Sequence, residues 1–322
     1  MKVAVVGLGV IGRVHARILR ERGELFAVCD IDPTRFPEDQ DLLCETDYLR
    51  LLDGLHPEAV HICTPHYLHA SMVIAALERN IHVLCEKPLC ISYAEIDAVL
   101  AAEKASKATL GVCFQNRYNP ANAFVKEYLK DKAVLAGTGS VVWKRTREYY
   151  AADAWRGKWA TEGGGVLINQ AIHTLDLLQW LVGMPRTLTA NLSTVALGDV
   201  IEVEDTASVF ATDGAEFSLF ATNASAKDFP VEIRLRTEEE QITILPHEVK
   251  VGETVHAFPK DAVIYGKPCY GAGHALLIED FYRCIREGRH FPIDAEEGAK
   301  AVRLVLAAYE SRGRSVSVGE QK

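Results

Sequence analysis

The chain has 322 residues, a formal net charge of −9 and 48% hydrophobic residues. This acidic balance, without a clustered basic stripe, argues against a nucleic-acid partner. No apolar run approaches the ~18–20 residues that span a bilayer, so we expect no membrane partner. The length exceeds what one hydrophobic core usually serves, which predicts two domains. The eight cysteines show neither a CxxC pair nor zinc spacing, which favours reduced thiols in a cytoplasmic protein without a metal site.

The first third of the chain alternates strand and helix patterns. Short apolar or β-branched runs predict strands at Val3–Val6, Leu25–Asp30, Ala59–Thr64, Ile81–Glu86 and Thr109–Phe114. Helical spacing lies between them, at Val10–Arg22, near Asp47–Gly54, at Leu68–Arg79 and from Ser92, where "SYAE" is typical of a capping box. Strands that alternate with helices predict βαβ units and therefore a parallel sheet with right-handed crossovers.

The pattern changes after about residue 117. Helices are predicted at Pro120–Lys130 and Val166–Val182, and strands at Ser140–Arg145, Leu188–Leu197, Val203–Thr212, Glu216–Asn223, Val231–Thr237 and Gln241–Leu245. Hairpin-like connections predict an α+β domain with a large, mostly antiparallel sheet. Helices Ala275–Glu287 and Ala295–Ser311 close the chain. We therefore expect a first domain over 1–117 and a second over 118–322, whose C-terminal helix is free to pack back on the first.

A glycine-rich loop joins the first strand to the first helix. In "VVGLGVIG", Gly7, Gly9 and Gly12 form G-x-G-x-x-G, with Val10 and Ile11 beginning the helix. Glycines at these positions permit a tight turn, a close backbone approach to a pyrophosphate and close helix–strand contact. The phosphates of a dinucleotide would then lie at the helix N-terminus, where N–H groups and the helix dipole favour anions.

Asp30 ends the second strand, 18 positions beyond Gly12 (30 − 12). A carboxylate at this place accepts hydrogen bonds from the ribose hydroxyls of NAD and repels the 2′-phosphate of NADP. Asp32 and Arg35 leave NADP open, since an arginine just past the strand can pair with that phosphate. The spacing favours NAD as the cofactor.

Three further segments give the chain a family resemblance. They are "ICTPHYLHA" (Ile62–Ala70), "CEKPL" (Cys85–Leu89) and "EGGGVLINQAIHTLDLLQWLVG" (Glu162–Gly183). Together with the glycine loop, they resemble the Gfo/Idh/MocA oxidoreductases, over essentially the whole chain. The resemblance implies a Rossmann domain followed by an antiparallel α/β domain, a cofactor at the carboxyl ends of the parallel strands, and a substrate between the domains. It also implies a homodimer or homotetramer built on the outer face of the antiparallel sheet.

The resemblance also implies which residues meet the cofactor. Those that line it after the third and fourth main strands and from the second domain are Thr64, Pro65, His66, His69, Glu86, Lys87, Asn116, Trp155 and Arg156. His66 stands where many relatives carry asparagine, and Arg117 resembles a residue that approaches the substrate. Each also has an ordinary structural interpretation, such as packing for Trp155 or a surface cation for Arg117.

The reacting end is predicted on one helix. Asn169, His173 and Asp176 fall at i, i+4 and i+7 and so share a face. Imidazole titrates near neutrality, so we assign His173 as the general acid/base and Lys87 as the donor that stabilises charge on the substrate oxygen. Burial beside a cationic nicotinamide should lower the pKa of Lys87. Asn169 replaces the aspartate of many relatives; it and Asp176 are expected to bind substrate hydroxyls, although the alternative for His173 is a core histidine paired with Asp176.

Three functions remain open at this point. The leading one is an NAD(P)-dependent oxidoreductase acting on a sugar, cyclitol or sugar derivative, a small polyhydroxylated substrate. The others are an NAD-retaining glycoside hydrolase that works by transient oxidation, and a non-catalytic NAD- or sugar-binding regulator. Further substrate-facing residues are expected around Arg147, Tyr149 and the "YGAGH" segment that ends at His274.

Overall fold

The computed structural model describes residues 1–39, 41–259 and 271–319. The chain divides into two compact units. The first unit comprises 1–115 with 261–299, and the second comprises 116–260 with 300–322. Residues 271–299 thus belong to the first unit, whereas the sequence pattern assigned them to the second. Tyr270 of the "YGAGH" segment lies outside the described residues.

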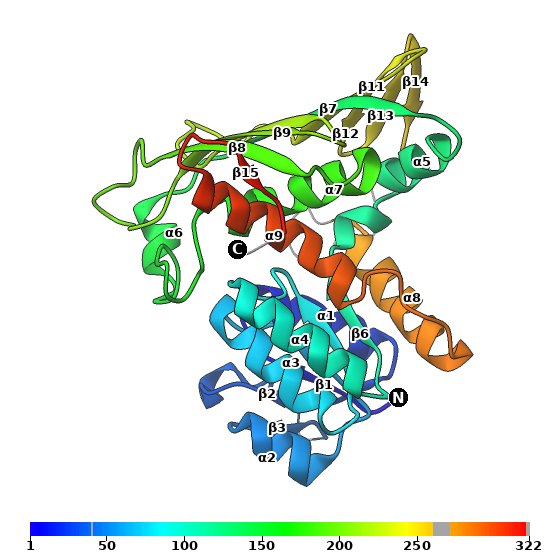
Figure 1. The fold of residues 1–322 in the computed structure, drawn as a ribbon. Helices are drawn as coiled ribbons and strands as arrows, with labels where there is room; N and C mark the ends of the chain where they lie inside the picture. Colours follow the sequence, from blue (N-terminus) through cyan, green and yellow to red (C-terminus); the bar gives the residue numbers. More distant parts are fainter. Residues whose placement is uncertain (40, 260–270, 320–322) are drawn as a thin grey trace. The chain divides into compact units, whose positions relative to one another are not determined.

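The first unit contains a parallel sheet, as predicted (Figure 1). It has six strands in the order β3-β2-β1-β4-β5-β6, of which β3 was not predicted from the sequence. Its strands are β1 (Val3–Val6), β2 (Leu25–Cys29), β3 (Leu43–Glu45), β4 (Ala59–Ile62), β5 (His82–Glu86) and β6 (Leu110–Cys113). Every residue of β1, β4 and β6 is buried, as expected for parallel strands covered on both faces. The strand order reverses between β1 and β4, and open α/β sheets bind ligands at such a switch point, outside the carboxyl ends of the strands.

Helices connect these strands. They are α1 (Val10–Glu21), α2 (Tyr48–Arg50), α3 (His69–Leu77) and α4 (Tyr93–Ala105), with short turns η1 (Pro33–Arg35), η2 (Leu51–Leu55) and η3 (His66–Leu68). The unit also contains α8 (Gly273–Glu287), which lies much later in the chain. Ser92 caps α4 by accepting a hydrogen bond from Glu95 N–H at 3.3 Å. The Glu95 carboxylate accepts in return from Ile91 N–H at 2.8 Å, which completes a capping box shifted by one residue.

Glycines in two elements explain why 271–299 packs in the first unit. A Cβ atom at Gly111 of β6 would lie 2.9 Å from the rings of Phe281 and Phe291. A Cβ atom at Gly298 would lie 2.4 Å from Val112 Cγ2, and Val112 N–H donates to Ile293 O at 2.8 Å. Because side chains are missing at both glycines, this distant segment of the chain can lie directly against β6.

The second unit contains a nine-stranded sheet in the order β14-β13-β12-β11-β7-β10-β9-β8-β15. Its strands are β7 (Val134–Val142), β8 (Thr187–Ser193), β9 (Thr206–Thr212), β10 (Phe217–Thr222), β11 (Glu232–Thr237), β12 (Gln241–Leu245), β13 (Glu248–Val251), β14 (Thr254–Ala257) and β15 (Val316–Ser317). Only the β7–β10 pair is parallel among the strands described, which confirms the mostly antiparallel prediction.

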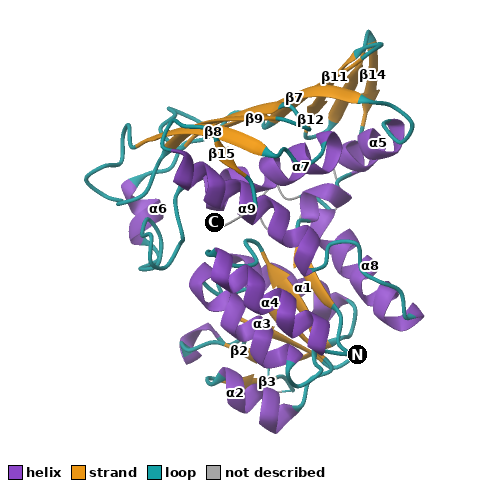
Figure 2. Cartoon of the chain, viewed as in Figure 1, coloured by secondary structure: helices purple, strands orange, loops and turns teal. Residues whose placement is uncertain are grey.

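Helices α5 and α7 pack against one face of this sheet (Figure 2). The helical elements from this part of the chain are η4 (Gln115–Tyr118), α5 (Pro120–Tyr128), α6 (Arg147–Ala151), η5 (Leu167–Ala171), α7 (Ile172–Val182) and α9 (Ala295–Ser311), which begins in the first unit. β7 begins at Val134 rather than at the predicted Ser140, because Gly137 and Gly139 interrupt the strand pattern. A Cβ atom at Gly139 would lie 2.7 Å from Thr174 Cγ2, so these glycines let α7 approach the strand.

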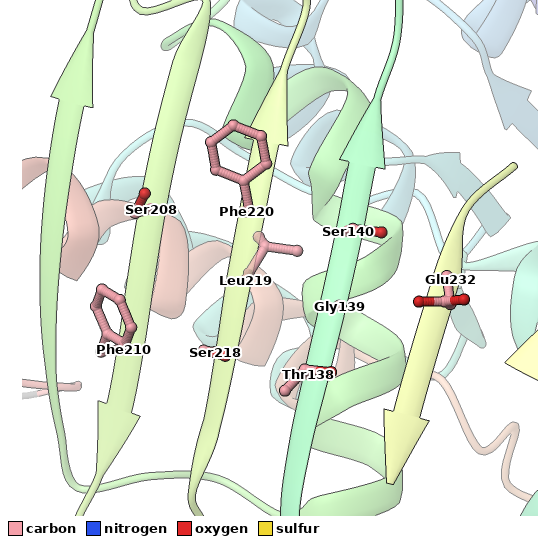
Figure 3. A pocket seen from close by; sticks show the side chains of 9 residues that line it. All are labelled: Thr138, Gly139, Ser140, Ser208, Phe210, Ser218, Leu219, Phe220 and Glu232. Carbon is pink, nitrogen blue, oxygen red and sulfur yellow. The ribbon is translucent and has the colours of Figure 1, made fainter. Parts of the chain in front are cut away.

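The other face of the sheet carries a shallow hollow over β7, β9, β10 and β11 (Figure 3). Phe210 and Phe220 line it and are 52% and 45% exposed. This is the face on which we predict homo-oligomerisation, since an exposed apolar patch commonly marks an interaction surface. Among the described residues, no helix is long and apolar enough to cross a membrane.

The approach at Gly298 gives a stability prediction. We expect Gly298→Ala to lower the free energy of unfolding by about 1–3 kcal/mol, because the stiff Val112 side chain cannot move out of the way. Gly54→Ala is the matched control, since a Cβ atom there meets nothing within 4 Å. Urea unfolding followed by circular dichroism measures both; equal midpoints for the two variants would contradict the packing argument.

Candidate active site

The glycine loop has the geometry that a dinucleotide requires. Gly7 follows β1 with φ +87°, and a Cβ atom at Gly12 would lie 1.8 Å from the carbonyl oxygen of Gly7. A Cβ atom at Gly9 would meet nothing within 4 Å, and Gly9 is the N-cap residue directly before α1. The loop thus combines close backbone packing at Gly12 with open space at a helix N-terminus, which fits a pyrophosphate.

Asp30 lies beside this loop at the carboxyl end of β2. It is 6% exposed, and its Oδ2 accepts a hydrogen bond from Leu8 N–H at 2.7 Å while Oδ1 accepts from Asp32 N–H at 2.9 Å. A carboxylate oxygen has lone pairs for more than one donor, so ribose hydroxyls can still be accepted. Arg35 lies 3.6 Å from Asp30 Oδ2 and 3.4 Å from Asp32 Oδ2, so its charge is shared between two carboxylates.

His69 joins the loops that follow β4 and β5. Its Nε2 lies 2.8 Å from Thr64 O and its Nδ1 lies 2.6 Å from Pro88 O. Burial lowers the pKa of His69 more than the two carbonyl groups raise it. Pro65 is half-buried, and His66 is buried with its ring centroid 5.9 Å from that of His69. The predicted cofactor residues of this loop are therefore held together by one buried imidazole.

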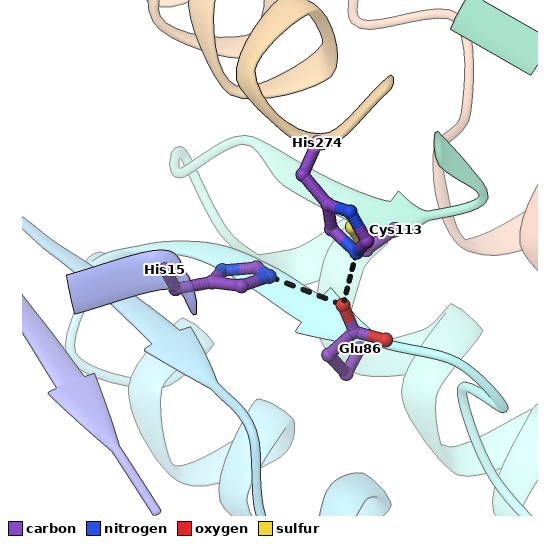
Figure 4. A group of neighbouring side chains, drawn as sticks. All are labelled: His15, Glu86, Cys113 and His274. Carbon is purple, nitrogen blue, oxygen red and sulfur yellow. Dashed lines mark hydrogen bonds and ion pairs between the residues drawn. The ribbon is translucent and has the colours of Figure 1, made fainter. Parts of the chain in front are cut away.

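Lys87 directly follows β5, and its N–H lies 3.2 Å from Glu86 Oε2. Glu86 itself is 5% exposed and faces two histidines (Figure 4). His15 Nε2 lies 3.1 Å and His274 Nε2 lies 3.5 Å from Glu86 Oε1. Burial raises the pKa of Glu86, but the hydrogen bonds from the two histidines outweigh it and hold that pKa well below its usual range. His274, which the sequence placed near the substrate, instead lies 1% exposed beside Glu86.

Arg117 and Asp176 bind each other in the second unit. Arg117 Nε donates to Asp176 Oδ2 at 2.8 Å, and an Arg117 Nη donates to Oδ1 at 2.5 Å. The two residues are 6% and 0% exposed. Asn116 is half-buried, and its backbone oxygen accepts from Asn122 Nδ2 at 2.7 Å. The bidentate pair joins the start of this unit to α7, and each of these predicted substrate residues is bound to the other.

Asn169 and His173 are the half-buried members of the predicted polar face, on consecutive turns of η5 and α7. Asn169 Nδ2 donates to Glu162 Oε1, and Glu162 Oε2 accepts from Gly157 N–H. The carbonyl oxygen of an amide that donates in this way is turned away from the carboxylate. Glu162 was not singled out from the sequence, although it begins the quoted "EGGG" segment.

A second buried carboxylate, Glu204, supports the start of the helix. It accepts hydrogen bonds from Gly165 N–H at 2.9 Å and Leu167 N–H at 3.0 Å, and from Tyr309 Oη at 3.1 Å. A Cβ atom at Gly165 would lie 1.8 Å from Glu204 O, so this glycine is needed for the contact. Burial raises the pKa of Glu204 to about 7.

Cationic and aromatic side chains alternate near this helix in the order Trp143, Arg145, Tyr149, Arg156 and Trp155. The Arg145 guanidinium lies 4.9 Å from the Trp143 ring and 5.3 Å from the Tyr149 ring, and Arg156 lies 4.7 Å from Tyr149 and 4.5 Å from Trp155. Tyr149 Oη also accepts from Gln170 Nε2 at 3.2 Å, which joins this ladder to the residue after Asn169. Arg147 lies apart and pairs with Asp199 at the surface.

Comparison with known proteins gives matches to both units. Residues 1–114 match the model of an oxidoreductase family with an NAD-binding Rossmann fold, and residues 133–243 match the GFO/IDH/MocA C-terminal domain. A putative UDP-kanosamine synthase oxidoreductase subunit from Amycolatopsis mediterranei is 30% identical over 72% of this chain and 71% of that protein. A levoglucosan dehydrogenase from Pseudarthrobacter phenanthrenivorans is 32% identical, over 46% of this chain and 39% of that protein.

Solved structures give matches over the whole length. The WlbA dehydrogenase from Bordetella pertussis, in complex with NADH and UDP-GlcNAcA, has a TM-score of 0.86 and 26% identity, with 99% of each chain covered.

The buried Arg117–Asp176 pair gives a prediction about the stability of the fold. We expect Asp176→Asn to lower the free energy of unfolding by about 3–5 kcal/mol, because it leaves a buried guanidinium without its counter-charge. Asp213→Asn is the control, since Asp213 and its partner Arg186 are exposed at the surface of the same unit. Urea unfolding of both variants tests this; an unchanged midpoint for Asp176→Asn would contradict it.

Buried histidines in the first unit predict acid sensitivity. Burial lowers the pKa of His61 well below its usual value and also lowers that of His274. A histidine neutral in the fold and titrating near ~6.5 when unfolded stabilises the fold above that pH, and each costs up to about 1.4 kcal/mol per pH unit below it. Unfolding free energies measured from pH 7.5 to 5.5 should therefore fall, with a smaller slope for His61→Gln. A flat parental profile would refute this assignment.

Proposed function

The chain belongs to the Gfo/Idh/MocA oxidoreductase family, and we propose that it is an NAD-dependent dehydrogenase of a sugar, cyclitol or sugar derivative. The observation that carries this proposal is the set of residues at the carboxyl ends of the parallel strands. The glycine loop, Asp30 and Lys87 all follow the carboxyl ends of these strands, where a dinucleotide binds. When bound, the nicotinamide supplies the acceptor for a hydride from a carbinol carbon.

NAD is the cofactor that this edge favours over NADP. Asp30 is a buried carboxylate at the end of β2, a place where it meets ribose hydroxyls and repels a phosphate. Arg35, which kept NADP open on sequence grounds, is already shared between Asp30 and Asp32. A 2′-phosphate would have to compete with both carboxylates for this guanidinium.

Two side chains perform the proton chemistry in this proposal. Lys87 donates a hydrogen bond to the substrate oxygen and stabilises its negative charge, while His173 removes the proton. Asn169 cannot act as a base, but its amide, oriented by Glu162, accepts from or donates to a neighbouring hydroxyl. The Arg117–Asp176 pair positions α7, so it supports His173 rather than touching the substrate.

A nucleotide-linked sugar is the substrate class that we favour. One relative that matches most of this chain is named for UDP-kanosamine, and the WlbA dehydrogenase structure is in complex with UDP-GlcNAcA. The ladder of Trp143, Arg145, Tyr149, Arg156 and Trp155 is suited to such a ligand, because arginines bind phosphate and aromatic rings stack on a base. Its hydrogen bond to Gln170 would place a nucleotide near Asn169.

A panel of free and nucleotide-linked sugars with NAD⁺ tests this function through the absorbance of reduced nicotinamide. We expect turnover with at least one member of the panel. Lys87→Met and His173→Gln should each lower kcat by about 10²–10⁴-fold, because each removes a proton-handling group, with NAD⁺ binding retained. Lys104→Met, an exposed lysine at the end of α4, should leave kcat unchanged.

Two results would contradict the proposal. Sugar release from aryl glycosides without net formation of reduced nicotinamide would identify a hydrolase that retains its cofactor. Binding of NAD⁺ and sugar without any turnover across the panel would identify a regulator.

A further inference from the structure

A line of buried polar side chains crosses the first unit and ends at Glu86. Tyr282 Oη lies 2.6 Å from His61 Nε2, and His61 Nδ1 lies 2.8 Å from His15 Nδ1. His15 Nε2 then lies 3.1 Å from Glu86 Oε1, which His274 Nε2 also approaches at 3.5 Å. These residues come from α1, β4, β5 and α8, and none is more than 5% exposed. Of these residues, only Glu86 and His274 were predicted from the sequence to lie near the cofactor or the substrate.

The hydrogen bonds of this line have one consistent direction. A neutral imidazole has one N–H donor and one acceptor nitrogen. The Tyr282 hydroxyl therefore donates to His61, His61 Nδ1–H donates to His15, and His15 Nε2–H donates to Glu86, which accepts as a carboxylate. Burial raises the pKa of Tyr282 and lowers that of His61, which agrees with a neutral hydroxyl and a neutral ring.

The opposite direction leaves a donor unsatisfied. If Glu86 carried a proton and donated to His15, His61 would have to donate to the Tyr282 oxygen. Within the described part of the chain, His61 is the one hydrogen-bond partner of the Tyr282 hydroxyl, so its hydrogen would then have no acceptor. Burial of an unpaired donor is unfavourable. The line as a whole therefore favours the charged form of Glu86.

Glu86 lies on the nicotinamide side of the predicted cofactor. Asp30, at the end of β2, marks the adenosine half of a dinucleotide that crosses the switch point between β1 and β4. β5 lies beyond β4, so its carboxyl end is on the side of the other half. The nicotinamide ring carries a positive charge in NAD⁺ and none in NADH, which makes it sensitive to a fixed negative charge nearby.

We propose that the line from Tyr282 to Glu86 holds a fixed carboxylate at this edge and thereby makes the protein bind NAD⁺ more tightly, relative to NADH, than it otherwise would. This inference rests on the proposed function. Other charged and titratable groups face Glu86: Lys87 follows it in the chain and opposes its effect, and the Cys113 thiol lies beside it. Burial and the charge of Glu86 raise the pKa of Cys113, so this thiol stays neutral. Glu86 is thus the negative charge of the cluster.

The test measures dissociation constants for NAD⁺ and for NADH, separately, by calorimetry or by NADH fluorescence. In Glu86→Gln, the preference for NAD⁺ over NADH should fall about tenfold or more, because a poorly screened charge is lost. Glu103→Gln is the control, and both variants are measured at pH 8.5, because burial raises the pKa of Glu103 to about 7 and its carboxyl group must be ionised for the comparison. Glu103 is also a partly buried carboxylate of this unit, but it lies near the end of α4, which leads to the start of β6 at the opposite sheet edge. Its ratio should equal that of the parent.

A purely structural role for Glu86 predicts a different result. Both dissociation constants would then rise together with their ratio unchanged, and the inference would be overturned while the proposed function stood. Failure of the parent protein to bind either form of the cofactor would overturn both. Circular dichroism of each variant shows that the compared proteins are folded.

A second variant keeps the test independent of Glu86 itself. Tyr282→Phe removes the first donor of the line without touching the cofactor edge, and it should shift the ratio in the same direction by a smaller factor. Glu86→Gln in a Lys87→Met background should still lower the ratio, which excludes an indirect effect through the lysine; an unchanged ratio there would overturn the inference.

The cluster in Figure 4 also has the composition of a metal site, since ligand atoms of His15, Glu86, Cys113 and His274 lie within 4.8 Å of one another. Metal analysis of the purified protein decides this point. Absence of bound zinc supports the carboxylate assignment. Stoichiometric zinc that is lost in Cys113→Ser would overturn it.

Discussion

The first unit depends on the burial of one carboxylate. Glu86 ends a central strand at 5% exposure, and a charge removed from water must be met by donors. Those donors come from α1, from α8 and from the backbone of Lys87. Because α8 supplies His274 and Tyr282, the segment 271–299 completes the sheet's polar interior as well as its apolar packing on β6. The need to pair the Glu86 carboxylate therefore fixes the end of β5, directly before Lys87, and holds α8 in this unit.

In the second unit, buried carboxylates around η5 and α7 likewise meet specific donors. Asp176 meets Arg117, Glu162 meets the Asn169 amide, and Glu204 accepts from the backbone at the start of η5. Each of these carboxylates is nearly inaccessible, so each requires specific partners and holds them in one orientation. Asn169 and His173 remain as half-buried polar groups on a mostly buried helix. Of the polar face predicted from the i, i+4, i+7 spacing, Asp176 is thus buried and paired, whereas Asn169 and His173 are half-buried.

Much of the fold could be predicted from local patterns. Five of the six parallel strands, the glycine loop and α7 were predicted correctly, because apolar runs, G-x-G-x-x-G and helical spacing are patterns of contiguous residues. The short strand β3 was not predicted. β7 was only partly found, because Gly137 and Gly139 weaken a strand pattern while serving contacts with α7. For the candidate site, the roles of Lys87 and His173 stay predictions, whereas the buried line of His15, His61 and Tyr282 that leads to Glu86 was not predicted. A histidine inside the buried run "AVHI" was the one available signal, since buried polar groups need partners.

By itself the sequence determined the order of elements, the dinucleotide loop, Asp30 at the end of β2 and a lysine at the end of β5, because each depends on neighbours within one element. Tertiary structure decided the partners of Glu86 and Asp176, the burial of His274 in the interior, and the unit to which α8 belongs. Contacts of this kind join distant residues, and Arg22, after α1, binds Glu279 of α8 across 257 positions of the chain. Nothing in a local pattern specifies which distant donor a buried charge will meet. Complementary burial in three dimensions makes that choice.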